Sequence, residues 1–282
     1  MRAAPVVGPM LEPRDKVAVI RFAGVIADAS ISRKGISYHR YAKAIDKAFD
    51  KGGVKAVALV INSPGGSAAQ TSLIANHIRQ RAEEKELPVF AFVEDVAASG
   101  GYWLACAADE IYAQESSIVG SIGVISASFG FEDFIEKHGI HRRLHTSGES
   151  KSFLDPFSPE KKEDVTRLKT IQEDIHEAFK SWVSERRGDV LNGSEKALFD
   201  GSFWTAGLAQ ERGLINGIGD LRSVMRTRFG DEVKFADIAP DKALSLPVPF
   251  LGKAQQTVMA HSLADDALDA LETRAIWARY GL

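Results

Sequence analysis

Short apolar runs rich in β-branched residues alternate with amphipathic helical patterns along the first part of the chain. The run Val54-Lys-Ala-Val-Ala-Leu-Val-Ile61 predicts a buried strand, because its apolar residues are nearly continuous rather than alternating. Strands joined by helices favour a largely parallel sheet that is covered on both faces. We therefore expect an α/β fold, with strands at 16–22, 54–61, 88–93 and 110–113 and helices at 37–51 and 71–85.

The rest of the chain predicts further helices. A helix of small residues is expected from Ser99 to about Ala108. Ser158 and Pro159 suit the cap and the first position of a long helix that runs to Arg187. Its apolar residues recur at spacings of three and four, which is typical of an amphipathic helix. Beyond it we expect a strand edge, a helix and a glycine-rich turn between 202 and 220, a surface segment at 240–249 and a terminal helix at 254–279.

Three segments differ in their expected role. Residues 1–15, with Pro5 and Pro9 in their apolar part, predict a flexible N-terminal arm. Residues 16–239 are expected to form the α/β domain. Residues 240–282 are expected to form a C-terminal helical extension that contacts another subunit.

Composition argues against several kinds of partner. The 282 residues carry a formal net charge of −3, which offers no strong field for phosphate backbones, so nucleic acid is not an expected partner. The single cysteine, Cys106, excludes an internal disulfide and a cysteine-rich zinc site, and a small buried residue explains it best. No metal or cofactor is expected. No segment has the roughly 20 apolar residues of a membrane helix, so we expect a cytoplasmic protein with at most peripheral contact at the inner membrane.

A serine and a lysine carry the candidate chemistry. Ser99 lies in Ala97-Ala-Ser-Gly-Gly-Tyr102, where small neighbours leave its hydroxyl uncrowded. A serine hydroxyl is a poor nucleophile at neutral pH and needs an adjacent base. Lys151 serves as that base only if burial keeps its amine neutral, and the apolar stretch 153–157 could provide that burial. The pair suggests a serine–lysine hydrolase.

Two glycine-rich segments supply candidate hydrogen-bond donors. The strand that ends at Ile61 leads into Asn62-Ser-Pro-Gly-Gly66, where glycines allow a sharp turn and leave a backbone N–H facing a cavity. The N–H of Gly100 follows the serine at the start of a helix, where the helix dipole favours negative charge. Two such donors suit the oxyanion of one tetrahedral intermediate.

Each of these features also has a purely structural interpretation. Ser99 could cap the following helix, Lys151 could be a solvated surface charge, and the paired glycines could form an ordinary turn. A histidine could be the base in place of the lysine, since catalytic triads form from residues distant in sequence. The histidines in question, His138, His141 and His145, lie in a charged segment and follow no metal-site spacing.

Four motifs together resemble the SppA-type signal peptide peptidases. They are Ile61-Asn-Ser-Pro-Gly-Gly66, Ala97-Ala-Ser-Gly-Gly-Tyr102, Gly120-Ser-Ile-Gly-Val124 and Ser150-Lys-Ser-Phe153. The resemblance implies a Clp/crotonase-like fold, with Ser99 as nucleophile and Lys151 as general base. It further implies Gly66 and Gly100 as oxyanion donors and Ser121 as the residue that orients the lysine amine.

The resemblance, which extends from about Lys16 to Asp220, also implies an assembly and a substrate class. Members of this family form rings in which the serine and lysine of one site can come from neighbouring subunits. They degrade cleaved signal peptides and other unstructured chains. We therefore expect peptide substrates and a homo-oligomer in which Lys151 acts in trans. The chain differs from the better-known members in that we expect no membrane anchor and a single catalytic unit.

Two other functions remain open at this point. Crotonase-like enzymes of the same fold bind the enolate of an acyl-coenzyme A thioester with paired N–H groups, and Ser99 would then be incidental. A non-catalytic oligomeric scaffold would need neither Ser99 nor Lys151. Acyl-coenzyme A turnover that survives the change Ser99→Ala would favour the first of these alternatives.

Overall fold

A mostly parallel sheet forms the centre of the protein. The structure, a computed structural model, describes residues 15–28, 35–148, 150–240, 270–271 and 273–282. The described strands follow the order β6-β5-β3-β2-β1-β8, and β4 pairs with β3 and with β7. Only the pair of β5 and β6 among them is antiparallel. The strands are β1 (Lys16–Ala23), β2 (Val54–Ser63), β3 (Val89–Ala98), β4 (Glu110–Ala113), β5 (Ile118–Gly120), β6 (Phe203–Thr205), β7 (Gly217–Ile218) and β8 (Lys234–Asp237).

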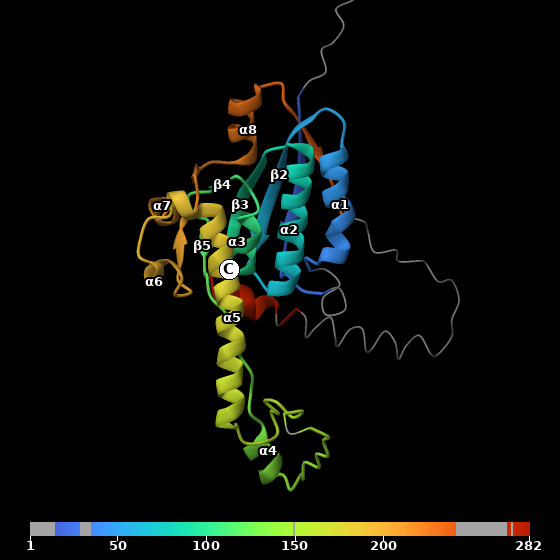
Figure 1. The fold of residues 1–282 in the computed structure, drawn as a ribbon, viewed down its shortest axis with the longest axis vertical. Helices are drawn as coiled ribbons and strands as arrows, with labels where there is room; N and C mark the ends of the chain where they lie inside the picture. Colours follow the sequence, from blue (N-terminus) through green and yellow to red (C-terminus); the bar gives the residue numbers. More distant parts are fainter. Residues whose placement is uncertain (1–14, 29–34, 149, 241–269, 272) are drawn as a thin grey trace, which may run out of the picture.

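Helices cover both faces of this sheet, which confirms the predicted α/β class (Figure 1). On one face, α1, α2 and α3 bury apolar side chains against β1, β2 and β3. On the other face, Met225 of α8 packs with Phe90 and Phe92 of β3. The helices are α1 (Tyr38–Asp50), α2 (Ala68–Lys85), α3 (Gly100–Ala105), α4 (Glu132–Lys137), α5 (Lys162–Arg187), α6 (Glu195–Leu198), α7 (Ala206–Glu211) and α8 (Leu221–Phe229).

The start of α2 is fixed by a serine cap. The Ser67 hydroxyl accepts a hydrogen bond from Gln70 N at 3.4 Å, which satisfies one of the free N–H groups at the helix start. α2 therefore begins at Ala68, three residues before the predicted start. Its buried side chains recur every three or four residues and turn one face of the helix onto the sheet. They are Thr71, Ile74, Ala75, Ile78 and Ala82.

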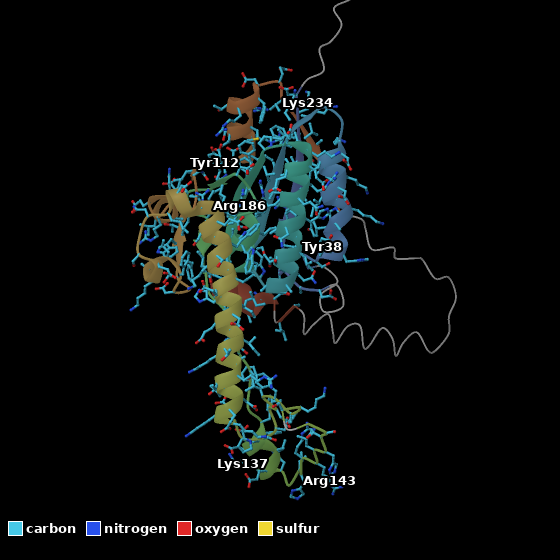
Figure 2. The ribbon with its side chains drawn as sticks, in the orientation of Figure 1. Tyr38, Tyr112, Lys137, Arg143, Arg186 and Lys234 are labelled. Carbon is cyan, nitrogen blue, oxygen red and sulfur yellow. The ribbon has the colours of Figure 1, made fainter. Side chains whose placement is uncertain are left out.

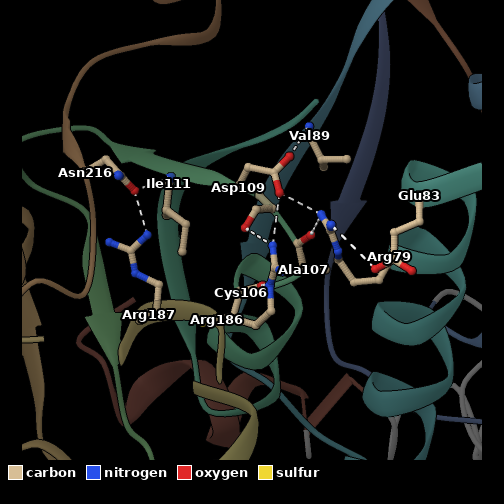
Figure 3. Close-up of polar contacts among 11 residues, drawn as sticks. Arg79, Glu83, Val89, Cys106, Ala107, Asp109, Ile111, Arg186, Arg187 and Asn216 are labelled. Atoms are coloured by element: carbon tan, nitrogen blue, oxygen red, sulfur yellow. Dashed lines mark hydrogen bonds and ion pairs between the residues drawn. The ribbon is translucent and has the colours of Figure 1, made fainter. Parts of the chain in front are cut away.

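Two arginines hold the C-terminal end of α3 (Figure 3). Arg79 of α2 donates to one of the carbonyls of residues 106–108, and Arg186 of α5 donates to the other two, at 3.1 to 3.3 Å. Both guanidinium groups also pair with Asp109, at 2.8 and 3.1 Å. Cationic side chains at a helix C-terminus satisfy its free carbonyls and oppose its dipole. α3 ends at Ala105, before the predicted end near 108.

The predicted start of the long helix is wrong. α5 begins at Lys162 and not after Ser158. Ser158 N donates to Asp155 O at 3.2 Å, and the Ser158 hydroxyl lies 3.4 Å from Asp155 Oδ2. The serine therefore completes a turn with the preceding aspartate, a common use of these two residue types. The predicted end of the helix at Arg187 is confirmed.

Residues 125–148 and 150–161, which we call the arm, project from the body beside the free end of α5 (Figures 1 and 2). Figure 2 labels Lys137 and Arg143 at its tip and Arg186 within the body. Phe129 on the arm is 80% exposed. The exposed apolar side chains of the arm are Ile125, Phe129, Phe131, Phe134, Ile140, Leu144 and Phe157.

The end of the chain returns to the body. Residues 270–271 and 273–278 are helical, and they form the red segment beside the lower end of the sheet in Figure 1. Most of the predicted terminal helix at 254–279, of the surface segment at 240–249 and of the N-terminal arm at 1–15 lies outside the described residues. Within the described part of the chain, no helix combines the length and the apolar character needed to cross a membrane.

Candidate active site

Ser99 occupies a strained turn between β3 and α3. Its backbone has φ +52° and ψ −124°, a conformation that only glycine adopts without cost. The residue stands at the cap position of α3, yet its side chain makes no capping hydrogen bond. The structural interpretation of Ser99 as a helix cap is therefore wrong. The hydroxyl is left free, and the small residues around it keep it half-exposed.

The pairing of β3 with β5 brings a second serine beside Ser99. Ala98 is the register partner of Gly120, and Ser99 N donates to Gly120 O at 2.8 Å. Ser121 follows directly, also with a positive φ of +56°. Its N–H donates to Ser202 O at 2.7 Å. Each strand is thus followed by a serine whose backbone is fixed by a hydrogen bond.

The glycine loop after β2 packs directly on Ser99. A Cβ atom on Gly65 would lie 2.8 Å from the Ser99 Cβ and from the Gly100 nitrogen. A Cβ atom on Gly66 would lie 2.0 Å from the carbonyl oxygen of Ile26. Both glycines have positive φ, at +100° and +141°. No other residue fits at either position, because an added carbon would collide with backbone atoms.

Two backbone N–H groups near Ser99 are unused. A Cβ atom on Gly100 would lie 3.4 Å from the Gly66 nitrogen, so the two glycines are neighbours. Among the described residues, neither the Gly66 N–H nor the Gly100 N–H donates a hydrogen bond. The Gly100 N–H stands in the first turn of α3, where the helix N-terminus attracts negative charge. An oxyanion could accept from both donors.

Lys151 is not brought to this cluster within one chain. Its side chain is exposed, and the turn that follows it binds Asp164 at the start of α5 through a backbone N–H, at 3.2 Å. Ser99 directly precedes α3. A backbone carbonyl of α3 accepts a hydrogen bond from Trp182 Nε1 of α5 at 3.0 Å. At 1.5 Å per residue, Asp164 and Trp182 are about 27 Å apart along the helix. The turn after Lys151 is thus bound at the first turn of α5, whereas the segments around Ser99 and Ser121 contact the helix at Trp182 and His176.

No histidine hydrogen-bonds to Ser99 in the described part of the chain. His77 pairs with Asp46 at 3.1 Å on the helical face, away from the glycine loop. His176 contacts the residue that follows Ser121, because its Nε2 lies 3.2 Å from Ile122 O. A Ser-His-Asp arrangement is thus not formed by these residues. The described residues also contain no group of three or more metal-binding side chains.

Cys106 belongs to the core, as predicted. Its thiol is fully buried beside Tyr102 and Arg187. Burial raises the pKa of this thiol to about 12, because the thiolate would lose its hydration. The Tyr102 hydroxyl donates to Leu214 O at 2.8 Å, and burial raises its pKa well above the usual value. These groups stabilise the packing of α3 and have no access to substrate.

The structure adds residues to the site that the sequence patterns did not indicate. Gly65 touches Ser99 more closely than Gly66 does, and a Cβ atom on Gly101 would lie 2.4 Å from Ser63 O. The paired glycines in each motif are a signal that could have led to both. Tyr280 lies 3.3 Å from Ser121 Oγ, and nothing in its local sequence indicates this. The apolar stretch 153–157 does not bury the neighbouring lysine within the chain, which differs from expectation.

Comparisons with known proteins place these features in a family. The model of peptidase family S49 matches residues 81–231. That range is more than half of the chain and includes Ser99, Gly100, Ser121 and Lys151. The chain belongs to peptidase family S49. The predicted resemblance to SppA-type peptidases is confirmed at the level of the family, and membership agrees with the Clp/crotonase-like fold that the resemblance implies.

Relatives of this S49 chain carry different names. It is 47% identical over 273 residues to a Brucella abortus protein named Na(+)/H(+) antiporter NhaA, a match to 95% of the chain and 37% of that protein. It is 33% identical over 214 residues to Protease 4 of Haemophilus influenzae, covering 75% of the chain and 34% of the relative. The chain thus spans about a third of each. A solved mutant of the 1510-N membrane-bound stomatin-specific protease aligns with a TM-score of 0.48 and 16% identity, over 81% of the chain and 100% of that protein.

Proposed function

We propose that this chain is a serine endopeptidase of the SppA type that cleaves signal peptides or other unstructured apolar peptides. The observation that carries the proposal is the Ser99 turn. The Ser99 backbone is held at φ +52°, and its hydroxyl makes no capping hydrogen bond. Two unused backbone donors lie beside it. The strained backbone costs folding free energy, and a role for Ser99 as the nucleophile explains why it is kept. Membership of family S49 supports the same conclusion.

The proposed reaction proceeds through an acyl-enzyme. Lys151, as a neutral amine, takes the proton of Ser99 while the serine oxygen bonds to the peptide carbonyl carbon. The carbonyl oxygen becomes an oxyanion that accepts hydrogen bonds from the Gly66 and Gly100 N–H groups. The protonated lysine then gives its proton to the leaving amine as the peptide C–N bond breaks. Water, deprotonated by the same lysine, attacks the serine ester, and the lysine returns the proton to the Ser99 oxygen as its bond to the acyl carbon breaks and the acid is released.

In this proposal the base comes from a neighbouring subunit. Lys151 lies on the arm, in a segment bound to the first turn of α5, whereas α3 contacts the helix at Trp182, and this separation supports a base from a second chain. The exposed apolar residues of the arm suit burial against a second copy. The same contact would bury the lysine amine, which would lower its pKa and keep it neutral as a base must be. The proposed assembly is a closed homo-oligomer.

Labelling with a fluorophosphonate probe followed by peptide mapping tests this function. We expect the probe to modify Ser99 in the wild-type protein, and to modify neither Ser99→Ala nor Lys151→Ala protein. Two matched controls, Ser72→Ala on α2 and Lys137→Ala on the arm, should label at the wild-type rate. Labelling of Ser99 that persists in Lys151→Ala protein contradicts the lysine as base.

The same samples separate the alternative functions. A wild-type protein that turns over an acyl-coenzyme A thioester, and does so equally well as Ser99→Ala, would be a crotonase-like enzyme that uses the two backbone donors alone. A protein inert toward the probe, peptides and thioesters would be a scaffold. The proposed location, the cytoplasm with at most peripheral contact at the inner membrane, is tested by fractionation with and without a high-salt wash.

A further inference from the structure

The last residues of the chain enter the candidate active site. The Tyr280 hydroxyl lies 3.3 Å from Ser121 Oγ and 3.4 Å from the carbonyl oxygen of Pro64, in the glycine loop. The residue is half-buried, and its backbone is held by a hydrogen bond from Tyr280 N to Trp277 O at 2.9 Å. Tyr280 therefore links the loop that carries one proposed oxyanion donor to the serine that follows β5.

The ring of Tyr280 is placed by the same strands that carry Ser121. Its centroid lies 5.2 Å from that of Phe203, with the rings inclined at 69°, an edge-to-face arrangement that is favourable for aromatic pairs. Phe203 is the register partner of Gly120, the residue before Ser121. The position of the hydroxyl beside Ser121 thus rests on a ring contact as well as on hydrogen bonds.

The single hydroxyl proton of Tyr280 limits the possible directions of its two hydrogen bonds. A hydroxyl has one proton to donate, whereas a backbone carbonyl can only accept. Both contacts of the Tyr280 oxygen are satisfied when it donates to Pro64 O and accepts the proton of Ser121. The Ser121 oxygen then keeps its lone pairs for another donor, and its own proton points away from the place where that donor arrives.

This direction matters for a lysine that acts as a base. A neutral amine has two N–H donors and one lone pair, and the lone pair must face the Ser99 proton. If Ser121 were free to rotate, its O–H could donate to that lone pair and occupy it. If Ser121 can only accept, it binds an N–H of the amine and leaves the lone pair for Ser99.

We propose that Tyr280 is a positioning residue of this active site, which keeps Ser121 as a hydrogen-bond acceptor for the amine of the catalytic lysine. The inference rests on the proposed Ser99 and Lys151 chemistry and goes beyond it, because it assigns a role to the C-terminal segment. On this proposal Tyr280 acts through Ser121, and its hydroxyl contacts in the described part of the chain are with Pro64 and Ser121.

A double-mutant cycle on the full-length protein tests the role, with a fluorogenic peptide amide of apolar sequence as substrate. Tyr280→Phe keeps the ring and removes only the hydroxyl. We expect kcat to fall about two- to tenfold, the usual effect of one hydrogen bond, with KM unchanged. In Ser121→Ala protein, the same change should have no further effect on kcat, because the hydroxyl then has nothing to orient. Tyr112→Phe, which removes a hydroxyl bound to Glu110, is the matched control and should leave kcat unchanged.

Each contrary result has a distinct meaning. An additive loss in the double variant, or a change confined to KM, overturns the positioning role. A rise in kcat in Tyr280→Phe also overturns it, because the tyrosine would then be blocking Ser121. A silent Tyr280→Phe change in a protein whose Ser99→Ala and Lys151→Ala forms are inactive overturns this inference alone. Full activity of those two forms overturns the proposed function itself.

Discussion

At the scale of single residues, the strain in this protein is concentrated at the candidate site. The described residues other than glycine that have positive φ are Glu86, Ser99, Ser121 and Leu154. Two of them, Ser99 and Ser121, directly follow the paired strands β3 and β5. Such conformations cost about 1 to 3 kcal/mol each and persist only where the surroundings enforce them. Here the hydrogen bonds from Ser99 N to Gly120 O and from Ser121 N to Ser202 O enforce them.

A single added carbon at Gly65 should therefore disable the site. In Gly65→Ala protein the new Cβ would lie 2.8 Å from the Ser99 Cβ and the Gly100 nitrogen, so the loop and the serine must separate. We expect fluorophosphonate labelling of Ser99 to be lost. The free energy of unfolding, measured with urea, should fall by about 1 to 3 kcal/mol.

Gly24→Ala is the matched control for this change. Gly24 has a similar φ of +107°, but nothing lies within 4 Å of the position of its Cβ. This variant carries the backbone cost without the collision. It should lose some stability and keep wild-type labelling. Equal labelling of the two variants would contradict the close packing of the loop on Ser99.

The site residues that the sequence predicts are those with a local signal. Ser99, Gly66 and Gly100 stand out because glycines and small residues surround a turn between a strand and a helix, and the required backbone conformation determines those residue types. Tyr280 has no such signal. Its contact with Ser121 joins positions far apart in the chain, and only the folded arrangement of β5, β6 and the C-terminal segment brings them together.

At the scale of elements, α3 is a short helix that is held by contacts at both of its ends. The glycine loop meets its N-terminus, while Arg79 and Arg186 bind the carbonyls that follow its C-terminus (Figure 3). A helix of six residues is too short to be stable on its own. Its position, and with it the position of Ser99, depends on these contacts.

Removing one of the two arginines should show this dependence. Arg186→Ala loses hydrogen bonds to Cys106 O and Ala108 O and the ion pair with Asp109. We expect the free energy of unfolding to fall by about 1 to 3 kcal/mol, because buried carbonyls lose their donors. Labelling of Ser99 should also slow. Lys169→Ala, an exposed position on the same helix, should change neither. Normal stability of Arg186→Ala protein would contradict the role of Arg186 in fixing the end of α3.

The sequence of this protein predicts its strands better than it predicts the residues at which its helices begin. β2 and β3 are recognised by near-continuous apolar runs, because both of their faces are buried. The predicted start of α5 is wrong because Ser158 and Pro159 also suit a turn, and Asp155 offers the serine a hydrogen-bond partner within that turn. Local sequence cannot decide between a cap and a turn when both satisfy the same groups.

At the scale of the whole molecule, we propose that the arm presents Lys151 to the active site of another copy. The arm and the free end of α5 extend from the body (Figure 1). In a closed ring each subunit presents the same two surfaces to its neighbours. The arm of one subunit would then reach the glycine loop of the next, and every site would combine two chains.

Mixing two inactive variants tests this arrangement. Ser99→Ala and Lys151→Ala proteins should each be inactive. After unfolding and refolding together in equal amounts, random assembly should restore about a quarter of the wild-type activity, because a site needs an intact serine in one subunit and an intact lysine in the next. Lys137→Ala mixed with Lys151→Ala should keep about half of the wild-type activity and is the control for losses during refolding. No recovery from a mixture that does form mixed oligomers would show that the pair forms in cis, as would an active monomer in light scattering.

The proposed separation of Lys151 from Ser99 within one chain also determines when the peptidase becomes active in the cell. A peptidase that prefers unfolded chains is a hazard while it is being made, since nascent proteins and its own incomplete copies are ready targets. On the proposed arrangement, a newly synthesised subunit holds a nucleophile without a base and is harmless. Proteolysis would begin only when subunits are abundant enough to meet, so dilution alone would switch it off.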